Sequence, residues 1–299
     1  MRVDAACRND AGCNMRGFVF LSLLVLAPAH ATAEGKKIFL DQESAGLPVG
    51  TKIVEKSAMT MSSKTLELSI GDLRLAGSLS DSGRLEEHGM QLTPDRVRYL
   101  LRSSNSRKVF RIDGKEDVKE EEQALVGVPV ILERDNGKWS ARLEKGEANK
   151  QQGEELDELA VRWNTDDDRV MYGNGPRRIG ESWKVDAADI PAFLGMADGV
   201  RGEVVFTLVG EKKVRGVRCA RLMGKIDCTA LMRGEDEDPD VKISLEGDFE
   251  IVRSLVYFED IAFEMEGKMT MLVEGPSPRG PLAMKSDGPF AMSGSLEIR

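Results

Sequence analysis

The chain has 299 residues, of which 41% are hydrophobic, and 42 basic side chains face 51 acidic ones to give a net charge of −9. That apolar content is enough for a sizeable core and excludes a wholly disordered chain. The negative balance argues against a nucleic-acid partner, because duplex binding needs a basic stripe that displaces phosphate counterions. Aromatic residues make up only 5% of the chain, which also argues against a base-stacking surface.

A short apolar run, 18–27, follows Arg16 and is itself followed by Ala-His-Ala-Thr-Ala. The run is too short for a membrane span, which needs about 20 residues. A positive flank, a short apolar run and a small-x-small exit are together typical of a secretory signal peptide. We therefore predict a signal peptide over residues 1–33, cleaved after Ala33 or, as a second choice, after Ala31.

The residues upstream of Met15 include two aspartates, which dilute the positive charge of a signal peptide, so Met15 is an alternative start of translation. Both cysteines of this segment precede the apolar run, so neither is placed to carry the lipid of a lipoprotein. No later apolar run is long enough to span a membrane. The mature chain, 34–299, is therefore expected to be exported, periplasmic or extracellular, soluble and not lipid-anchored.

Strand signals come first in the mature chain. Apolar and polar residues alternate over 66–70 and again over 73–75, which is typical of strands with one covered face. Asn-Gly stands between two apolar runs within 135–138, and this pair tolerates positive φ at both positions of a tight turn. The sequence therefore predicts a β-hairpin at this point.

Two short helices are predicted in the middle of the chain. Over Glu154–Trp163 the apolar residues recur at i, i+3, i+4 and i+7 and form one stripe, and two glutamates occupy the first turn. A second candidate, Ala187–Met196, contains Pro191 and is therefore broken or begins late.

The last third of the chain has the cleanest alternation. It extends over Asp240–Ile251, over Tyr257–Val273 and over 290–298. These long strands follow Val200 without a helical crossover, which makes a parallel sheet improbable. About ten to twelve strands are expected in total, as in a large curved sheet or open barrel.

The predicted fold class is mainly β: a large curved antiparallel sheet, or open half-barrel, with two or three short helices acting as a lid. The mature chain is expected to form one β-rich domain. Two halves, 46–150 and 176–299, joined by a helical segment over 152–163, are the alternative organisation.

The inventory of reactive side chains argues against most enzyme classes. After signal cleavage the chain keeps one histidine, His88, which we interpret as an exposed turn residue, and no zinc, nucleophile-elbow or phosphate-loop motif is present. The acidic clusters 164–168 and 235–240 lack the glycine and glutamate of a calcium loop, which indicates solvated loop charge. We therefore expect no metal and no cofactor. A carboxylate pair acting on a glycosidic bond stays possible, but no pair is singled out.

Two cysteines, Cys219 and Cys228, remain in the mature chain. If Met223-Gly224 formed a two-residue hairpin loop, the thiols would face each other and a Cys219–Cys228 disulfide would be allowed in an exported protein. If Val217–Met232 is instead one strand, nine steps of about 3.3 Å separate the thiols by about 30 Å. Both alternatives stand at this point.

The stretch Val209-Gly-Glu-Lys-Lys-Val-Arg-Gly-Val-Arg-Cys-Ala-Arg-Leu222 resembles the hairpin of bacterial outer-membrane lipoprotein-sorting carriers. The chain from Leu125 through the Asn-Gly hairpin and the predicted helix to Ile179-Gly-Glu-Ser-Trp183 is similar to uncharacterised exported bacterial proteins built on the same plan. The resemblance covers about residues 125–260. It implies an open half-barrel whose concave face is capped by short helices and, in the carriers, holds acyl chains. No residue matches a diagnostic ligand contact of that family.

We therefore expect a non-catalytic exported protein that binds an apolar small molecule or a lipidated protein beneath a helical lid. Flexible methionine side chains on the apolar sheet faces suit an adaptable cavity. A structural or protein-interaction module with a filled core is the alternative, and a carboxylate-dependent hydrolase is the third. The residues predicted to line the ligand site are Leu156, Leu159, Trp163, Phe263, Met265 and Met269.

Overall fold

The computed structural model describes residues 36–41, 47–165, 167–190, 199–233, 239–276 and 280–299. The predicted signal peptide with its cleavage site at Ala33 lies outside these ranges, as does most of the helix predicted over Ala187–Met196. Contacts within the chain separate Met1–Gly35 from the compact unit Lys36–Arg299.

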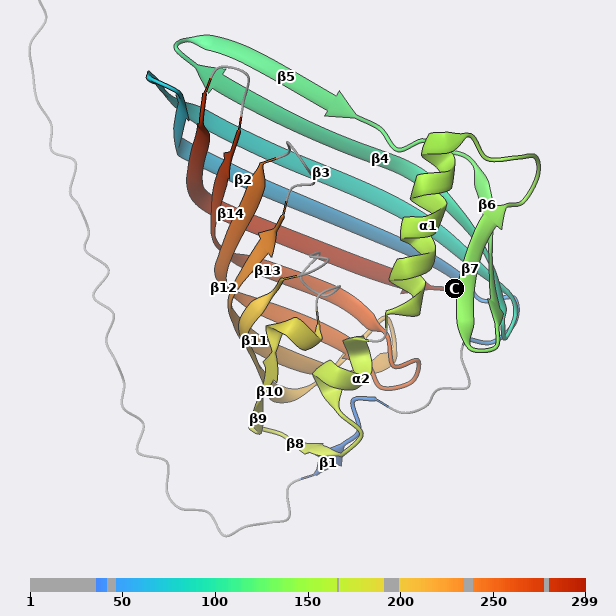
Figure 1. The fold of residues 1–299 in the computed structure, drawn as a ribbon. Helices are drawn as coiled ribbons and strands as arrows, with labels where there is room; N and C mark the ends of the chain where they lie inside the picture. The colour runs from blue at the N-terminus through green and yellow to red at the C-terminus, as the bar shows by residue number, and fades with distance from the viewer. Residues whose placement is uncertain (1–35, 42–46, 166, 191–198, 234–238, 277–279) are drawn as a thin grey trace, which may run out of the picture. The chain divides into compact units, whose positions relative to one another are not determined.

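Within the described ranges, twelve strands form one antiparallel sheet in the order β7-β6-β4-β3-β2-β14-β13-β12-β11-β10-β9, with β5 paired to β4 (Figure 1). The end strands β7 and β9 are not paired with each other, so the described sheet is open. The predicted curved antiparallel sheet is confirmed. The strands are β2 (Lys52–Ile70), β3 (Leu73–Thr93), β4 (Arg96–Ile112), β5 (Lys115–Glu121), β6 (Pro129–Asp135), β7 (Lys138–Leu143), β9 (Ser182–Asp186), β10 (Arg201–Val214), β11 (Val217–Met232), β12 (Asp240–Ser254), β13 (Asp260–Gly275) and β14 (Leu282–Ile298). A separate two-stranded sheet pairs β1 (Lys37–Ile38) with β8 (Arg177–Arg178).

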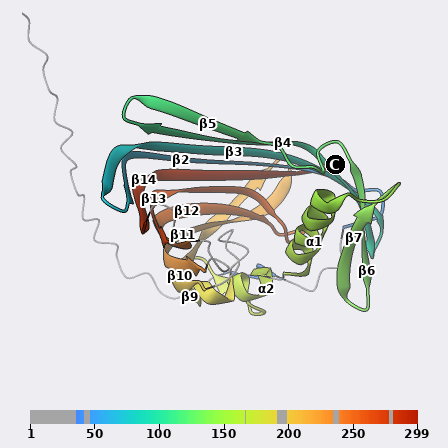
Figure 2. The same ribbon diagram turned by 45° about the horizontal axis from the view of Figure 1, so that its top comes forward.

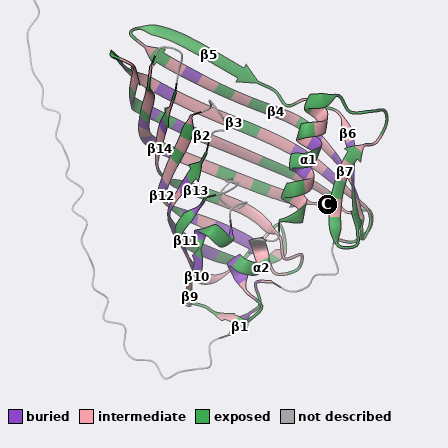
Figure 3. Cartoon of the chain, in the orientation of Figure 1, coloured by how far each residue is buried: buried purple, intermediate pink, exposed green. Residues whose placement is uncertain are grey.

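Each long strand alternates between a covered and a wetter face, as the colouring in Figure 3 shows. We call the covered face the inner face. Cross-strand pairing places Phe249, Met265, Met292 and Met59 in one row on it, because each residue is the register partner of the next. The alternation predicted over 240–251 and 257–273 therefore assigns the apolar residues of β12 and β13 to the correct face.

Glycines on the inner face let neighbouring strands approach closely where the sheet bends. Gly247 of β12 lies opposite Gly267 of β13. A Cβ at Gly267 would lie 2.1 Å from the carbonyl oxygen of Glu246, and one at Gly247 would lie 2.5 Å from that of Glu266. A side chain at either position would collide with backbone atoms, so these glycines permit the bend that β12, β13 and β14 show along their length (Figure 1).

The predicted Asn-Gly hairpin is confirmed between β6 and β7. Asn136 has φ 50° and Gly137 has φ 81°, which are the left-handed values of a type I′ turn.

Helix α1 spans Lys150–Asn164 and begins four residues earlier than predicted. The reason is a capping box: the Asn149 side chain accepts from the backbone of Gln152, and the Gln152 side chain accepts from the backbone of Asn149. The glutamates expected in the first turn therefore lie one turn further along. One of them, Glu155, accepts from the backbone N–H of Ala124 at 2.7 Å and that of Leu125 at 2.9 Å, which ties α1 to the loop before β6.

Two shorter helical segments complete the described structure. Helix α2 (Asp167–Tyr172) was not predicted and begins within the acidic cluster 164–168. The segment η1 (Ala187–Asp189) is one 3₁₀ turn at the start of the predicted second helix. Figure 2 shows α1 beside β7 and α2 near β9 and β10.

Most of the buried apolar residues form two clusters on the inner face. One lies between α2, the N-terminal strand β1 and the strands β9–β14, and includes Tyr172, Phe206 and Phe249. The other lies between α1 and the strands β4, β6 and β7, and includes Leu156 and Leu159. Helix α1 therefore covers the sheet with the apolar stripe that the sequence predicted.

The hairpin alternative for the cysteines is wrong, and with it the Cys219–Cys228 disulfide. Strand β11 runs without interruption from Val217 to Met232, and its register with β12 pairs Cys219 with Ser254 and Cys228 with Leu245. The two thiols lie on one extended strand, so they are too far apart to bond. Both are buried and free.

We expect two titratable thiols in the unfolded chain 34–299 and almost none in the folded chain. Burial raises the pKa of both thiols, that of Cys228 to about 11, so neither is a reactive thiolate at neutral pH. Thiol titration with a chromogenic disulfide, with and without denaturant, measures this difference. Fewer than two thiols in the unfolded chain would contradict the continuous strand.

Candidate functional site

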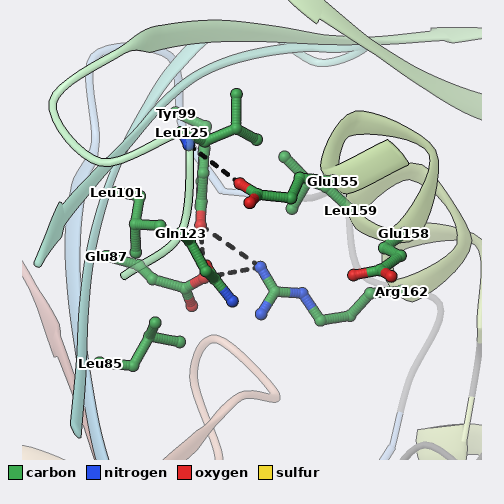
Figure 4. Close-up of a pocket in the computed structure, with 10 residues that line it drawn as sticks. All are labelled: Leu85, Glu87, Tyr99, Leu101, Gln123, Leu125, Glu155, Glu158, Leu159 and Arg162. Carbon is green, nitrogen blue, oxygen red and sulfur yellow. Dashed lines mark hydrogen bonds and ion pairs between the residues drawn. The ribbon is translucent and has the colours of Figure 1, made fainter. Parts of the chain in front are cut away.

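A cavity of about 970 Å³ opens beside α1 on the inner face of the sheet. A smaller cavity of about 150 Å³ lies beneath α1, and the two share Glu87, Tyr99 and Arg162 as lining residues (Figure 4). The larger volume is at the upper end of the range of small-molecule sites. Its apolar lining comprises Leu47, Ile53, Pro94, Trp139, Trp163, Phe263, Met292 and Leu296.

Two tryptophans hold the apolar wall at the end of α1. Trp163 of α1 meets Trp139 of β7 edge to face, with ring centroids 5.0 Å apart. The Asn164 side chain accepts from the backbone N–H of Trp139 and donates to its carbonyl oxygen, both at 2.8 Å. These contacts fix the end of α1 against the hairpin, so the lid is held in place at this point.

An arginine of the lid is tied to the sheet across the smaller cavity. Arg162 donates to Glu87 at 2.6 Å, and the hydroxyl of Tyr99 donates to the same carboxylate oxygen (Figure 4). Glu87 is buried. Burial and the Glu87 charge both raise the pKa of the Tyr99 hydroxyl, which therefore stays a proton donor at neutral pH.

A second glutamate stands next to this pair without a cation of its own. Glu55 of β2 is the register partner of Glu87 of β3, so the two carboxylates lie side by side on the inner face. Like charges in directly opposed positions of a sheet are normally destabilising. The surrounding protein and then the Glu87 charge raise the pKa of Glu55.

A fully buried arginine organises the opposite wall of the larger cavity. Arg253 of β12 donates to Asp260 and to Asp168, each at 2.9 Å, and its Nε donates to the carbonyl oxygen of Leu40 at 2.6 Å. Its guanidinium lies 4.0 Å from the ring centroid of Tyr172, whose hydroxyl donates to Asp260 at 2.6 Å. One arginine thus holds two carboxylates that line the cavity.

Glu259 stands beside this arginine cluster and lines the same cavity. The residue before it, Phe258, has φ 58°, a left-handed value that is strained for an aromatic residue. Burial and the Asp168 charge raise the pKa of Glu259 to about 8. Burial also raises the pKa of Asp168, to about 6, against the opposing effect of Arg253. Glu259 therefore carries a proton for most of the time at neutral pH.

The structure brings some of the sequence-predicted ligand residues to the cavities and not others. Trp163 and Phe263 line the larger cavity, and Leu159 lines the smaller one. Leu156 is buried between α1 and the sheet, Met265 is buried in the larger core cluster, and Met269 packs against that cluster. None of these last three lines either cavity.

The ionisable lining was not predicted from the sequence. The prediction of an exposed turn histidine is wrong: His88 is half-buried, lies within β3 and lines the larger cavity, 2.8 Å from Glu86. Asp168 belonged to a cluster interpreted as solvated loop charge, yet it pairs with a buried arginine. The sequence pattern does contain one indication that Arg253 is buried. The apolar residues of Asp240–Ile251 occupy odd-numbered positions, and Arg253 continues this series, so it lies on the inner face.

No group of three or more histidine, cysteine, aspartate or glutamate side chains among the described residues is arranged to hold a metal ion. No helix within the described ranges is long and apolar enough to cross a membrane.

No family model matches the chain and no curated protein sequence is similar to it. Among solved structures, lipovitellin is similar over 84% of this chain and 26% of its own, with 9% identity and a TM-score of 0.40. An outer-membrane channel from Pseudomonas putida is similar over 87% of this chain and 99% of its own, with 11% identity and a TM-score of 0.19. A DUF1329-family protein from Desulfovibrio piger is similar over 84% of this chain and 85% of its own, with 9% identity and a TM-score of 0.16. None of these similarities reaches a TM-score of 0.5.

Proposed function

We propose that this chain is an exported, non-catalytic binding protein that takes an apolar small molecule, or the lipid group of a lipidated protein, in the larger cavity. The observation that carries the proposal is the cavity itself: about 970 Å³ on the inner face, beside a helix that is fixed at its end by Trp139 and Trp163. Export rests on the signal-peptide pattern of residues 1–33.

The volume and lining support a ligand rather than the filled core of a structural module. Tryptophan, phenylalanine, methionine and leucine side chains supply apolar surface that gains free energy when a ligand displaces water from it. Polar groups on the opposite wall supply orientation. A protein whose only task is to present an outer surface gains nothing from such a space.

Filling the cavity is expected to abolish binding. Gly294 lines the cavity, and a Cβ there would meet only the Phe263 Cβ at 3.8 Å and the Lys56 carbonyl oxygen at 3.9 Å, which are ordinary contacts. Gly294→Phe therefore places a ring in the cavity without a backbone clash, and we expect at least about a tenfold loss of affinity for the uncharged probe N-phenylnaphthylamine. Fluorescence titration measures it.

The matched control is Ala291→Phe, which adds the same ring to the other face of β14 and should leave affinity unchanged. Mass spectrometry of molecules that co-purify with the unmodified chain identifies the natural occupant. Absence of saturable probe binding together with absence of a co-purified molecule would reject the proposal.

One observation favours a second candidate, a carboxylate-dependent hydrolase. Glu259 holds its proton at neutral pH while Asp168 and Asp260 lie against Arg253 in the same cavity. Carboxyl groups whose environments separate their pKa values are the usual acid and base of glycoside hydrolysis. A screen of glycoside and ester substrates with the unmodified chain and with Glu259→Gln tests it, and a turnover that Glu259→Gln removes would replace the binding proposal.

A further inference from the structure

The charges that line the larger cavity do not balance. Five acidic side chains face it, whereas the basic side chains that do are two arginines and His88, which lies 2.8 Å from Glu86. Arg134 is already paired outside the lining, with Asp95 at 2.6 Å. Arg162 is already paired with Glu87, and Arg253 behind the wall is shared between Asp168 and Asp260. The cavity therefore has more carboxylates than the protein's own cations serve. The acidic lining residues are Glu55, Glu87, Asp168, Glu259 and Asp260.

The two surplus carboxylates are Glu55 and Glu259. Neither side chain forms a hydrogen bond or an ion pair with any residue in the described ranges, although both line the cavity. Glu259 is the more enclosed of the two, and the charge of Glu55 acts on it across the cavity. Glu259 is half-buried and Glu55 is exposed to the cavity, so a ligand can reach both carboxylates, and a positively charged group would complement the acidic lining that the protein's own cations leave unpaired.

We infer that the cavity selects a cationic amphiphile, an alkyl chain bearing a positively charged ammonium group, with the ammonium between Glu55 and Glu259 and the chain against the tryptophan wall. The inference deepens the proposed function and depends on it. An ammonium group would bring a positive charge to the surplus carboxylates, and Trp163 and Phe263 add aromatic surface in the same cavity.

Two alternative occupants fit less well. A bare metal ion needs several ligands converging on one point, and no such group exists among the described residues. A fatty acid would bring a further carboxylate into a cavity that already has five acidic side chains, and this negative charge would oppose the ionisation of Glu259 even more strongly. An organic cation, which is larger than a metal ion, can contact carboxylates that stand apart.

The charges around Glu259 make binding depend on pH. Asp168 of α2, Asp260 of β13 and Glu55 of β2 oppose its ionisation, and Arg253 of β12 favours it. Because the pKa of Glu259 is about 8 in the free protein, a cation must release its proton at neutral pH. Affinity for a cation of fixed charge should therefore rise as pH increases from 6 to 9.

The test compares two probes with the same chain length below their micelle concentrations. Isothermal titration calorimetry with the unmodified chain is expected to show dodecyltrimethylammonium binding at least about tenfold more tightly than dodecanoate. Its affinity should increase between pH 6 and 9. The quaternary ammonium does not titrate, so any pH dependence comes from the protein.

The double variant Glu55→Gln with Glu259→Gln should lower the affinity for dodecyltrimethylammonium by about tenfold or more, a much larger loss than any change in the affinity for the uncharged N-phenylnaphthylamine. Both side chains lack partners, so their replacement should not unfold the chain. The control is Glu246→Gln, an exposed carboxylate on the outer face of β12 that lines neither cavity.

Equal or tighter binding of dodecanoate, or no effect of the double variant, would overturn the inference while phenylnaphthylamine binding still supported the proposed function. If none of the three probes bound, the proposed function itself would fail. The two failures are therefore distinguishable.

Discussion

Replacing Arg253 with methionine is expected to lower the free energy of unfolding by about 3–5 kcal/mol at pH 7. Arg253 is fully buried and donates to Asp260, Asp168 and the Leu40 carbonyl oxygen. Methionine keeps the apolar stem and removes the charge, so two carboxylates lose their cation close to Glu259. Removing one partner of a buried ion pair costs far more than the pair itself contributes, because the other charge stays desolvated. Urea denaturation measures the difference.

The matched control is Arg221→Met. Arg221 forms a two-pronged ion pair with Glu250 at 2.9 and 2.8 Å, but this pair lies on the exposed face of the sheet, where such pairs contribute about 0–1 kcal/mol. Adding Asp168→Asn to Arg253→Met should recover part of the lost stability, since it removes one uncompensated charge. A loss in Arg253→Met no larger than that in Arg221→Met would show that the buried cluster does not hold the cavity wall.

Local patterns predicted the elements whose periodicity is strong. Strands β12, β13 and β14 alternate apolar and polar side chains, and the Asn-Gly pair has a steric reason to form the β6–β7 turn. The stripe of α1 predicted which side of that helix covers the sheet, because residues three and four apart share one face. In each of these elements a few adjacent residues contain the information.

Strands β2 and β3 extend well beyond the short alternating runs at 66–70 and 73–75. Much of β3 is serine, glycine and charged residues, which have low strand propensity, and pairing on both sides with β2 and β4 keeps it extended. This is tertiary structure overriding local preference. The apolar signal was therefore present only near the β2–β3 turn.

The ionisable site depends on contacts between residues far apart in the chain. Glu55 meets Glu87 through strand register, and Arg253 meets Asp168 through the position of α2. No spacing in the sequence encodes either meeting. A charged residue on an apolar face, as Arg253 is, marks a buried ion pair without naming its partner. The sequence could therefore have indicated that a site exists but not which carboxylates compose it.

Stability should fall as pH rises through the neutral range, and Glu259 should account for much of the fall. Its pKa is about 8 in the folded chain against an ordinary value of 4.5 for an unfolded glutamate. Between these values the folded state keeps a proton that the unfolded state has released, so raising the pH favours unfolding. The loss is complete above about pH 8. Because Glu259 is partly exposed to the cavity, we expect about 2–4 kcal/mol between pH 5 and pH 9.

Glu259→Gln cannot ionise, so its free energy of unfolding should change much less over the same pH range and should exceed that of the unmodified chain at pH 9. Asp168, whose pKa is raised to about 6, adds a loss of the same sign at lower pH, and this part should persist in the variant. Urea denaturation at unit steps from pH 5 to pH 9 separates the two contributions, and Glu246→Gln, which changes an exposed carboxylate, should follow the unmodified chain. Parallel curves for Glu259→Gln and the unmodified chain would mean that Glu259 ionises freely in the folded protein. The cavity would then hold a solvated carboxylate. A cation that binds beside Glu259 would release no proton at neutral pH.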